Sequence, residues 1–308
     1  MAFTFAHFSD VHLGPMPPGA VWQDFAFKRV LGGLSWALRR RAIHSPAVAE
    51  ALVADIQAHN PDHIAFTGDL INIAAKPEFP RGARWLAKVG SVDAVSFVPG
   101  NHDAYVHVTD HDGLRHFSDY MAGDLKRPEG SDGKVFPFVR LRRNVAFIGL
   151  DTARPQSLWR AGGTLGDTQL NMLGVQLRDL KARGFYRVVM LHHPPLPGLA
   201  VARKALTDAA ALQSVLKAEG AELVLHGHNH RRMFNTFAWE GGVAAVNGVP
   251  SASSTGHGAH EAAEWHHYSV DRSKAQWRTT LTVRALVGGT TRFESQPAIE
   301  LFHDANPV

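Results

Sequence analysis

Five short apolar stretches of this chain each break into a loop that carries aspartate, asparagine or histidine. Apolar runs of about four to eight residues bounded by glycine or proline are typical of buried strands. In α/β folds, ligands bind outside the carboxyl ends of such strands. If the strands lie together in sheets, their polar loops meet at one edge and form a site. The loops are Asp10-Val11-His12, Gly68-Asp69, Gly100-Asn101-His102-Asp103, His192-His193 and Gly227-His228-Asn229-His230.

Composition narrows the class of protein and the chemistry of the site. Hydrophobic residues make up 45% of the 308 residues and charged residues 19%, which allows a large core and excludes global disorder. The net charge of +4 is small for this length, so we expect no nucleic-acid partner. The chain has no cysteine, which excludes disulfides and thiolate metal sites, whereas its 19 histidines allow metal or proton chemistry.

Helical and strand patterns alternate up to about residue 230, and strand patterns follow. Ser45-Pro46 predicts a helix that runs to about His59, because serine caps helices and proline fits the first turn. We see no internal repeat and no low-complexity linker. The pattern predicts an α/β fold in one domain, 1–308, with two sheets inside, helices outside and a β-rich C-terminal part, 231–308.

The segment 15–44 is predicted to be a lid or a surface segment near the site. Within it, residues 28–41 combine Lys28-Arg29, Trp36 and Arg39-Arg40-Arg41. One interpretation is a solvated face, which charge runs usually form. The other is peripheral contact with membrane lipid through a basic segment that contains tryptophan.

The first residues lack a basic start followed by a long apolar run, which argues against a signal peptide. No apolar run approaches the ~18 residues that a membrane-spanning helix needs. We therefore expect a cytoplasmic location, with a peripheral position at a membrane as the alternative.

The ordered set Asp-x-His, Gly-Asp, Gly-Asn-His-Asp, His-His-Pro-Pro and Gly-His-x-His resembles the calcineurin-like metallophosphoesterase superfamily. The matching blocks extend from Asp10 to His230. The resemblance implies a four-layer α/β/β/α sandwich with two central mixed sheets and a dinuclear metal site at the ends of strands. The extended blocks Gly-Asn-His-Asp-x-Tyr, with Tyr105, and His-His-Pro-Pro-Leu-Pro are similar to the class III cyclic-nucleotide and glycerophosphodiester phosphodiesterases.

The resemblance also implies seven metal ligands, which supply oxygen and nitrogen and no sulfur. Such ligands suit two ions of Mn, Fe or Zn. One carboxylate shared by two ions holds them about 3.5–4 Å apart. His192 is preferred over His193 because the family ligand directly follows the strand and stands two residues before proline. The implied ligands are Asp10, His12 and His230 for the first ion, Asn101, His192 and His228 for the second, and Asp69 as the bridge.

Other residues of these blocks are expected to act on the substrate. His102 is expected to face the phosphate, where it stabilises an oxyanion or protonates the leaving group. Asp103 either orients that imidazole or stabilises the turn. His193 is expected beside the ligands, in contact with substrate. The remaining histidines, such as His44, are expected to be structural or surface residues.

These features predict metal-dependent hydrolysis of a phosphoester. The expected substrate is a small phosphodiester, such as a cyclic nucleotide or a glycerophosphodiester, attacked by a hydroxide activated at the dinuclear centre. The alternatives are a hydrolase of a lipid-linked phosphate or diphosphate, and a phosphomonoesterase. Outside the enzymes, the alternative is a metal-binding scaffold protein.

Overall fold

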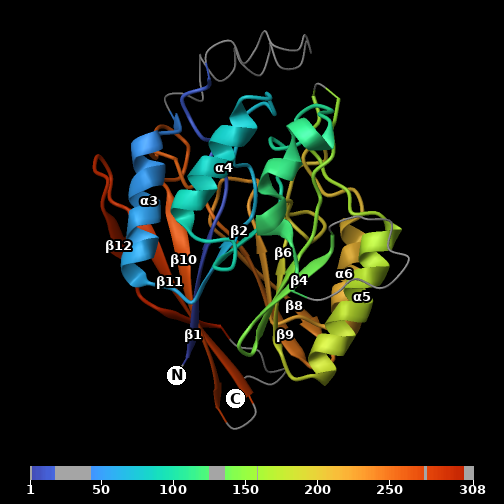
Figure 1. Cartoon of the computed structure of the whole chain (residues 1–308). Coiled ribbons are helices and arrows are strands. Elements are labelled where there is room, and N and C mark those ends of the chain that lie inside the picture. The colour runs from blue at the N-terminus through green and yellow to red at the C-terminus, as the bar shows by residue number, and fades with distance from the viewer. Residues whose placement is uncertain (1, 18–42, 125–135, 158, 274–275, 302–308) are drawn as a thin grey trace.

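The computed structural model describes residues 2–17, 43–124, 136–157, 159–273 and 276–301. Within them, two mixed β-sheets lie side by side between two pairs of helices (Figure 1). The predicted α/β/β/α sandwich is therefore confirmed. That the chain forms a single domain stays a prediction.

The first sheet has seven strands, namely β1 (Phe3–Phe8), β2 (His63–Phe66), β3 (Val95–Phe97), β10 (Glu264–Ser273), β11 (Gln276–Leu286), β12 (Phe293–Ser295) and β13 (Ile299–Leu301). Their order is β12-β11-β10-β1-β2-β3, and β13 pairs with β11. β1, β2 and β3 are parallel, whereas β10 runs antiparallel to β1. The β-rich C-terminal part thus extends the sheet that the first strand begins.

The second sheet has six strands, namely β4 (Phe138–Arg142), β5 (Val145–Gly149), β6 (Tyr186–Met190), β7 (Leu223–His226), β8 (Met233–Trp239) and β9 (Gly242–Gly248). Their order is β4-β5-β6-β7-β9-β8, with parallel pairing from β5 to β9. In β6, Tyr186 and Val188 belong to the core between the sheets, whereas Val189 packs on the helical side. Both faces are buried, so β6 is continuously apolar.

Helices α3 (Pro46–His59) and α4 (Glu78–Val89) cover the first sheet, and α5 (Asp167–Ala182) and α6 (Ala209–Glu219) cover the second (Figure 1). α3 has the predicted bounds. The Ser45 hydroxyl accepts a hydrogen bond from the backbone N–H of Val48 at 3.4 Å, and Pro46 occupies the first turn. Two short 3₁₀ helices, η2 (Asp110–Asp112) and η3 (Leu114–Met121), lie between β3 and β4.

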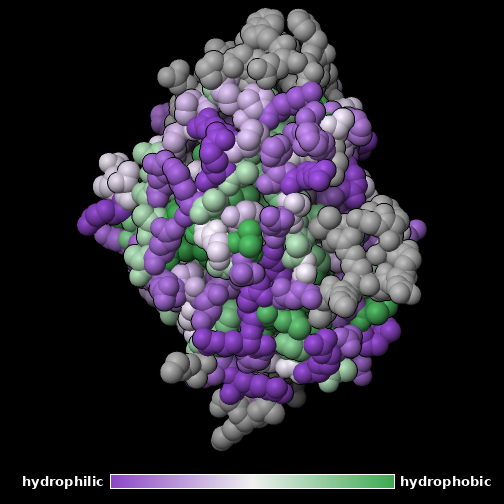
Figure 2. Space-filling view, viewed as in Figure 1, coloured by the Kyte–Doolittle hydropathy of each residue, from purple (hydrophilic) through white to green (hydrophobic). Residues whose placement is uncertain are grey.

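The visible surface is mixed in character. In Figure 2, hydrophobic residues form separate areas among hydrophilic ones, which is normal for a folded protein. No helix among the described residues is long and apolar enough to cross a membrane. Residues 28–41, and most of segment 15–44, lie outside the described residues, so the lid and the lipid contact stay predictions. The cytoplasmic location also stays a prediction.

Three buried histidines lie between the sheets. His7 on β1 pairs in register with His266 on β10, and His226 ends β7 on the other sheet. All three are fully buried. Burial lowers the pKa of His266 to about 3, assisted by the positive charge of Arg232, and burial lowers the pKa of His226 to about 4. These imidazoles therefore stay neutral in the folded protein at pH values where the unfolded chain takes up protons.

We predict that acid destabilises the fold through these groups. Below a pH of about 6.5 the unfolded His266 binds a proton that the folded one does not bind until about pH 3. The free energy of unfolding therefore falls as the pH drops through this window, by up to about 1.4 kcal/mol per pH unit for one such histidine. Urea unfolding at several pH values should show a shallower fall for His266→Gln. The exposed control His260→Gln should keep the wild-type slope, and equal slopes in all three proteins would contradict the assignment.

Candidate metal centre

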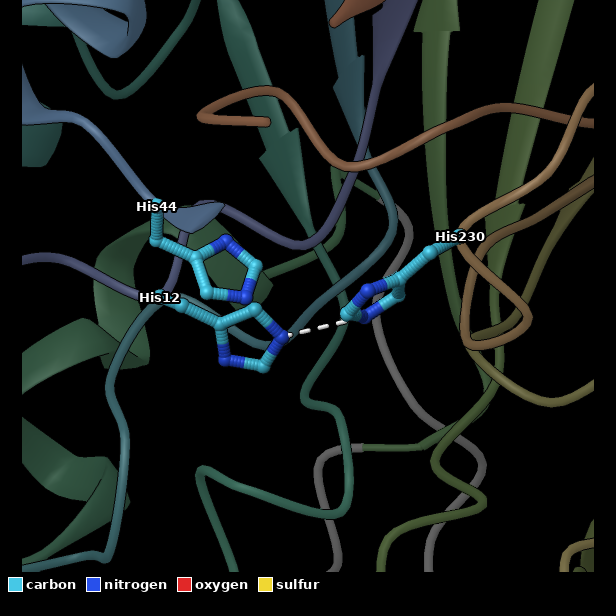
Figure 3. Close-up of side chains that lie close together, drawn as sticks. All are labelled: His12, His44 and His230. Carbon is cyan, nitrogen blue, oxygen red and sulfur yellow. Dashed lines mark hydrogen bonds between the residues drawn. The ribbon is translucent and has the colours of Figure 1, made fainter. Parts of the chain in front are cut away.

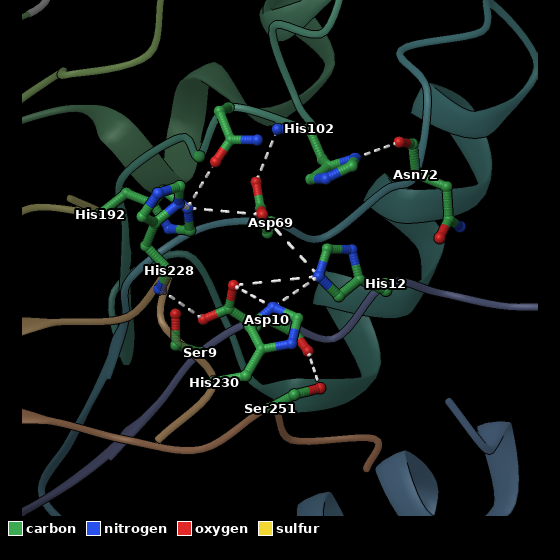
Figure 4. A network of polar contacts seen from close by, with 12 residues as sticks. Ser9, Asp10, His12, Asp69, Asn72, His102, His192, His228, His230 and Ser251 are labelled. Carbon is green, nitrogen blue, oxygen red and sulfur yellow. Dashed lines mark hydrogen bonds and ion pairs between the residues drawn. The ribbon is translucent and has the colours of Figure 1, made fainter. Parts of the chain in front are cut away.

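The predicted site forms where strands of both sheets end. Figure 4 shows side chains from these ends turned toward one another. The loops after β1 and β2 are joined by backbone hydrogen bonds from Asp10 to Gly68 at 2.9 Å and from His12 to Asp69 at 3.0 Å. On the second sheet, the backbone N–H of Gly227 donates to the carbonyl of His192 at 3.0 Å. The polar loops therefore converge because their parallel strands are paired.

Asp10, His12 and His230 form the first group of side chains. Nε2 of His230 lies 3.1 Å from Nε2 of His12 and 3.1 Å from Oδ1 of Asp10. Nε2 of His12 is 3.9 Å from the same carboxylate oxygen. Ligand atoms bonded to one ion at about 2.0–2.2 Å lie roughly 3–4 Å from one another. The spacing of this group therefore fits a transition-metal ion.

Asn101, His192 and His228 form the second group. Nε2 of His192 lies 3.2 Å from Oδ1 of Asn101 and 3.3 Å from Nδ1 of His228. Nδ1 of His192 is 2.7 Å from the carbonyl of Thr67, to which it donates, so in the neutral ring, which is the form that binds metals, Nε2 carries the lone pair. Imidazole nitrogens and an amide oxygen again suit a transition metal.

The Asp69 carboxylate joins the two groups. Its Oδ2 lies 3.4 Å from Nε2 of His192 and 3.8 Å from Nε2 of His12. One oxygen thus faces both groups, which suits a carboxylate that bridges two ions through a single oxygen. The structure brings all seven predicted ligands together in the predicted grouping, and their coordination of metal stays a prediction.

Backbone donors decide which carboxylate oxygens face the ions. Oδ2 of Asp10 accepts a hydrogen bond from the backbone N–H of His228 at 2.9 Å, which leaves Oδ1 toward the histidines. Oδ1 of Asp69 accepts from the backbone N–H of His102 at 2.7 Å, which leaves Oδ2 between the groups. Each aspartate therefore presents one oxygen in a defined direction.

The site carries two buried negative charges. Burial alone would raise the pKa of Asp69, but His192, His102 and His12 outweigh burial and lower that pKa. Burial opposes the ionised form of Asp10 too, and His230 and His192 lower its pKa. Burial likewise disfavours the protonated form of His192, but Asp69 and Asp10 raise its pKa to about 9. The two carboxylates therefore attract positive charge, which is what bound metal ions supply.

Five of the seven predicted ligands have backbone angles in the left-handed region, which non-glycine residues rarely adopt. They are Asp10, His12, Asp69, His228 and His230, with φ values of 56°, 45°, 56°, 70° and 53°. Each such angle costs on the order of 1–3 kcal/mol and persists where surrounding contacts enforce it. Strain concentrated on these residues supports a functional role for them.

Glycine allows the close approach of the loops. A Cβ at Gly100 would collide with Oδ1 of Asp69, and one at Gly227 would collide with Oδ2 of Asp10. The glycines of both motif blocks therefore make room for the two carboxylates.

His102 lies at the edge of the first group. Its ring is 4.8 Å from that of His12, nearly perpendicular to it, and it stacks on Tyr105 with 5.3 Å between centroids. Nδ1 of His102 donates to the carbonyl of Asn72. This bond orients the ring and places the Nε2 lone pair on its far side. The expected contact with substrate stays a prediction.

Asp103 accepts hydrogen bonds from the turn, as one of its two expected roles requires, and the other role, orienting His102, stays a prediction. Its Oδ2 accepts hydrogen bonds from the backbone N–H groups of Asp69 at 2.8 Å and Gly100 at 2.9 Å, and its Oδ1 accepts from Ile71 at 3.0 Å. The carbonyl of Asn72 accepts from Nδ1 of His102. Asp103 thus links the loop after β2 to the loop after β3. These two loops are neighbours because β2 and β3 are paired.

His193 lies beside the ligands, as expected, and its contact with substrate stays a prediction. It is fully buried. Its Nδ1 lies 2.7 Å from the Thr152 hydroxyl, and its Nε2 donates to the carbonyl of Ala161 at 3.1 Å. Burial and the neighbouring His192 lower the pKa of His193 to about 3, so it is neutral. His193 holds the loop around Ala161 beside the second group.

His44 is a site residue that the sequence patterns did not indicate. It lies outside every motif block, yet its ring centroid is 4.6 Å from that of His12 (Figure 3). A hydroxyl of the 247–253 region also contributes, since Ser251 donates to the carbonyl of Asp10 at 2.6 Å. No periodicity or spacing in the chain marks these contacts, because they join residues that are distant in the sequence, and Ser251 and Asp10 are 241 positions apart.

We predict that Asp103→Ala destabilises the protein. Buried backbone donors that lose an acceptor cost about 1–3 kcal/mol each, and three donors face this carboxylate. Asp103→Asn keeps one acceptor oxygen and should lose less. Urea unfolding measures both changes. Unchanged stability of Asp103→Ala, together with lost hydrolysis, would contradict the turn-stabilising role.

Comparison with known proteins agrees with this geometry. Residues 3–232 match the family model described as calcineurin-like phosphoesterase. A protein named probable cyclic nucleotide phosphodiesterase, from Synechococcus sp. (strain WH7803), is 40% identical over 78 residues, which cover 23% of this chain and 29% of that protein. The chain thus aligns with less than a third of this relative.

Two solved structures share the fold. A dimetal phosphatase from Danio rerio superposes with a TM-score of 0.68 at 16% identity, covering 98% of this chain and 99% of that one. A purple acid phosphatase from yellow lupin (Lupinus luteus) seeds superposes with a TM-score of 0.58 at 11% identity, covering 99% of this chain and 54% of that one. The family match contains all seven predicted ligands, and the chain therefore belongs to the calcineurin-like phosphoesterase family.

Proposed function

We propose that this protein hydrolyses a small phosphodiester at a centre of two transition-metal ions. The observation that carries the proposal is the position of Asp69, whose Oδ2 faces His12 in one group and His192 in the other. Membership of a phosphoesterase family supplies the reaction class.

The residues fit two ions of Mn, Fe or Zn, because the donors are oxygen and nitrogen at spacings that bound ions produce. When bound, such ions lower the pKa of a water molecule and neutralise charge on phosphate oxygens. The chain's own part is to hold the ligands in place. The backbone N–H groups of His228 and His102 do this for the two carboxylates.

His102 is the side chain proposed to assist the leaving group. Its donation to Asn72 orients the ring and leaves Nε2 to exchange a proton with the departing oxygen. His102 is only 8% exposed, which limits its motion. Tyr105 stacks on this imidazole and helps to hold the ring plane.

A diester substrate is favoured by two observations. The partial relative from Synechococcus is named a probable cyclic nucleotide phosphodiesterase, and the block with Tyr105 resembles that class of enzyme.

The loop 194–206 is held against the site, since Nδ2 of Asn229 donates to the carbonyl of Leu199 at 2.8 Å. We propose that this loop contacts the second ester group.

We predict that Asp69→Asn removes both metal binding and hydrolysis. The asparagine amide lacks the negative charge of the Asp69 carboxylate, whose Oδ2 faces both groups of predicted ligands. Metal content and turnover of bis(p-nitrophenyl) phosphate should both fall to background, whereas the exposed control Asp271→Asn keeps wild-type values. Full turnover by Asp69→Asn would show that the reaction occurs elsewhere.

The substrate class can be decided by measuring hydrolysis of a panel of phosphate compounds by the wild-type protein with Mn²⁺ or Fe²⁺. The panel contains cyclic nucleotides, glycerophosphodiesters, nucleotide sugars and phosphomonoesters. We expect a phosphodiester to give the highest kcat/KM. Turnover of phosphomonoesters alone would replace the diesterase proposal with a phosphatase. If a lipid-linked phosphate or diphosphate were preferred, the result would favour the alternative in which residues 28–41 contact lipid.

We predict that His102→Ala slows diesters with poor leaving groups more than those with good ones. General acid catalysis contributes about 10²–10⁴-fold, and p-nitrophenolate needs little protonation to depart. The loss in kcat should therefore be large for an alkyl diester and small for the p-nitrophenyl ester. His111→Ala, an exposed histidine on η2, is the matched control. Equal losses for both substrates would argue against proton transfer by His102.

A further inference from the structure

His44 is held in place by the chain that follows the second sheet. It forms an isolated β-bridge with Ser254. The backbone N–H of Ser45 donates to Ser253 at 2.8 Å, and that of Thr255 donates to Ile43 at 2.9 Å. The backbone around His44 is therefore anchored on both sides, which fixes the origin of its side chain.

The imidazole of His44 lies against the first group of ligands. Only 5% of the residue is exposed. Its ring centroid is 4.6 Å from that of His12 and 5.7 Å from that of His230 (Figure 3). One ring nitrogen of each of these three histidines lies within 4.8 Å of the other two, which is a spacing that could hold a metal ion.

Two serines determine which nitrogen of His44 carries the proton. The Ser251 hydroxyl donates to the carbonyl of Asp10 at 2.6 Å, so its oxygen accepts from Nδ1 of His44 at 3.2 Å. The Ser253 hydroxyl is 2.8 Å from the same nitrogen. Nδ1 is thus assigned as the donor, and Nε2 carries the lone pair. Histidines that bind metals show this arrangement, in which the other nitrogen donates to a protein oxygen.

We propose that His44 joins His12 and His230 as a further ligand of the first metal ion. The proposal rests on the proposed function, because it assumes the metal centre. It gives the first ion three imidazole ligands, whereas the second group has two. Imidazole suits Zn and Fe, and carboxylate and water suit Mn. The first position should therefore prefer Zn or Fe over Mn, and His44 should be the source of part of that preference.

The test is metal binding without substrate. Metal-stripped wild-type protein, His44→Ala and His44→Gln are titrated with Zn²⁺ and with Mn²⁺ by calorimetry, and with Co²⁺ by visible absorption. The exposed His260→Ala is the matched control. Ser253→Ala keeps the imidazole but removes one of its two hydroxyl partners. Circular dichroism and thermal unfolding of the metal-free proteins identify variants that fail to fold, and His44→Gln keeps a polar group for the serines.

We expect wild type and His260→Ala to bind two ions. His44→Ala and His44→Gln should bind one of the two at least about tenfold more weakly, with a larger loss for Zn²⁺ than for Mn²⁺ and altered Co²⁺ bands. Ser253→Ala should show a smaller loss of the same ion, since partners of ligating histidines contribute about 10–100-fold to metal affinity.

Unchanged affinities and Co²⁺ bands in folded His44→Ala and His44→Gln would overturn the proposal. If kcat/KM alone changed in these variants, His44 would contact the substrate instead of the ion, and the ligand role would again be wrong. Failure of wild-type protein to bind two ions would overturn the proposed function as well. The two failures are distinguishable because the wild-type titration alone decides the second.

Discussion

The structure of this site depends on the burial of two ionised carboxylates, Asp10 and Asp69, between the ends of two sheets. A buried charge is costly unless it is paired and hydrogen-bonded. Here one oxygen of each carboxylate accepts from a backbone N–H, and the other faces histidine nitrogens. The negative charge that remains makes the space selective for cations.

The loops reach this arrangement at the expense of backbone strain. Residues such as His12 and His230 hold left-handed angles that their side chains disfavour. The parallel pairing of β1 with β2, and of β6 with β7, enforces these angles by carrying each loop across the end of its neighbour. Rigid sheets thus stabilise conformations that an isolated loop would leave. Preorganised ligands of this kind need little rearrangement when an ion binds.

Residues that are not predicted ligands hold the loops around the ligands in place. Asp103 collects three backbone donors from the loops after β2 and β3, and His193 ties the Ala161 loop to the second group. The sequence left two roles open for Asp103, orienting His102 or stabilising the turn, and predicted a contact with substrate for His193. The hydrogen bonds of both residues show how they hold the loops around the ligands. His44 is the opposite case, since it packs against His12 from a part of the chain with no motif.

The sequence by itself determined the layered fold, the bounds of α3, and the side chains that gather at the strand ends. These three features follow from local patterns, because apolar runs, helix caps and motif blocks each consist of residues that are close together in the sequence. Tertiary structure decided what Asp103, His193 and His44 contact. Their partners, Asp69, Ala161 and Ser251, lie 34, 32 and 207 positions away. Strand pairing sets such contacts, and no local pattern records which loops a given pairing brings together.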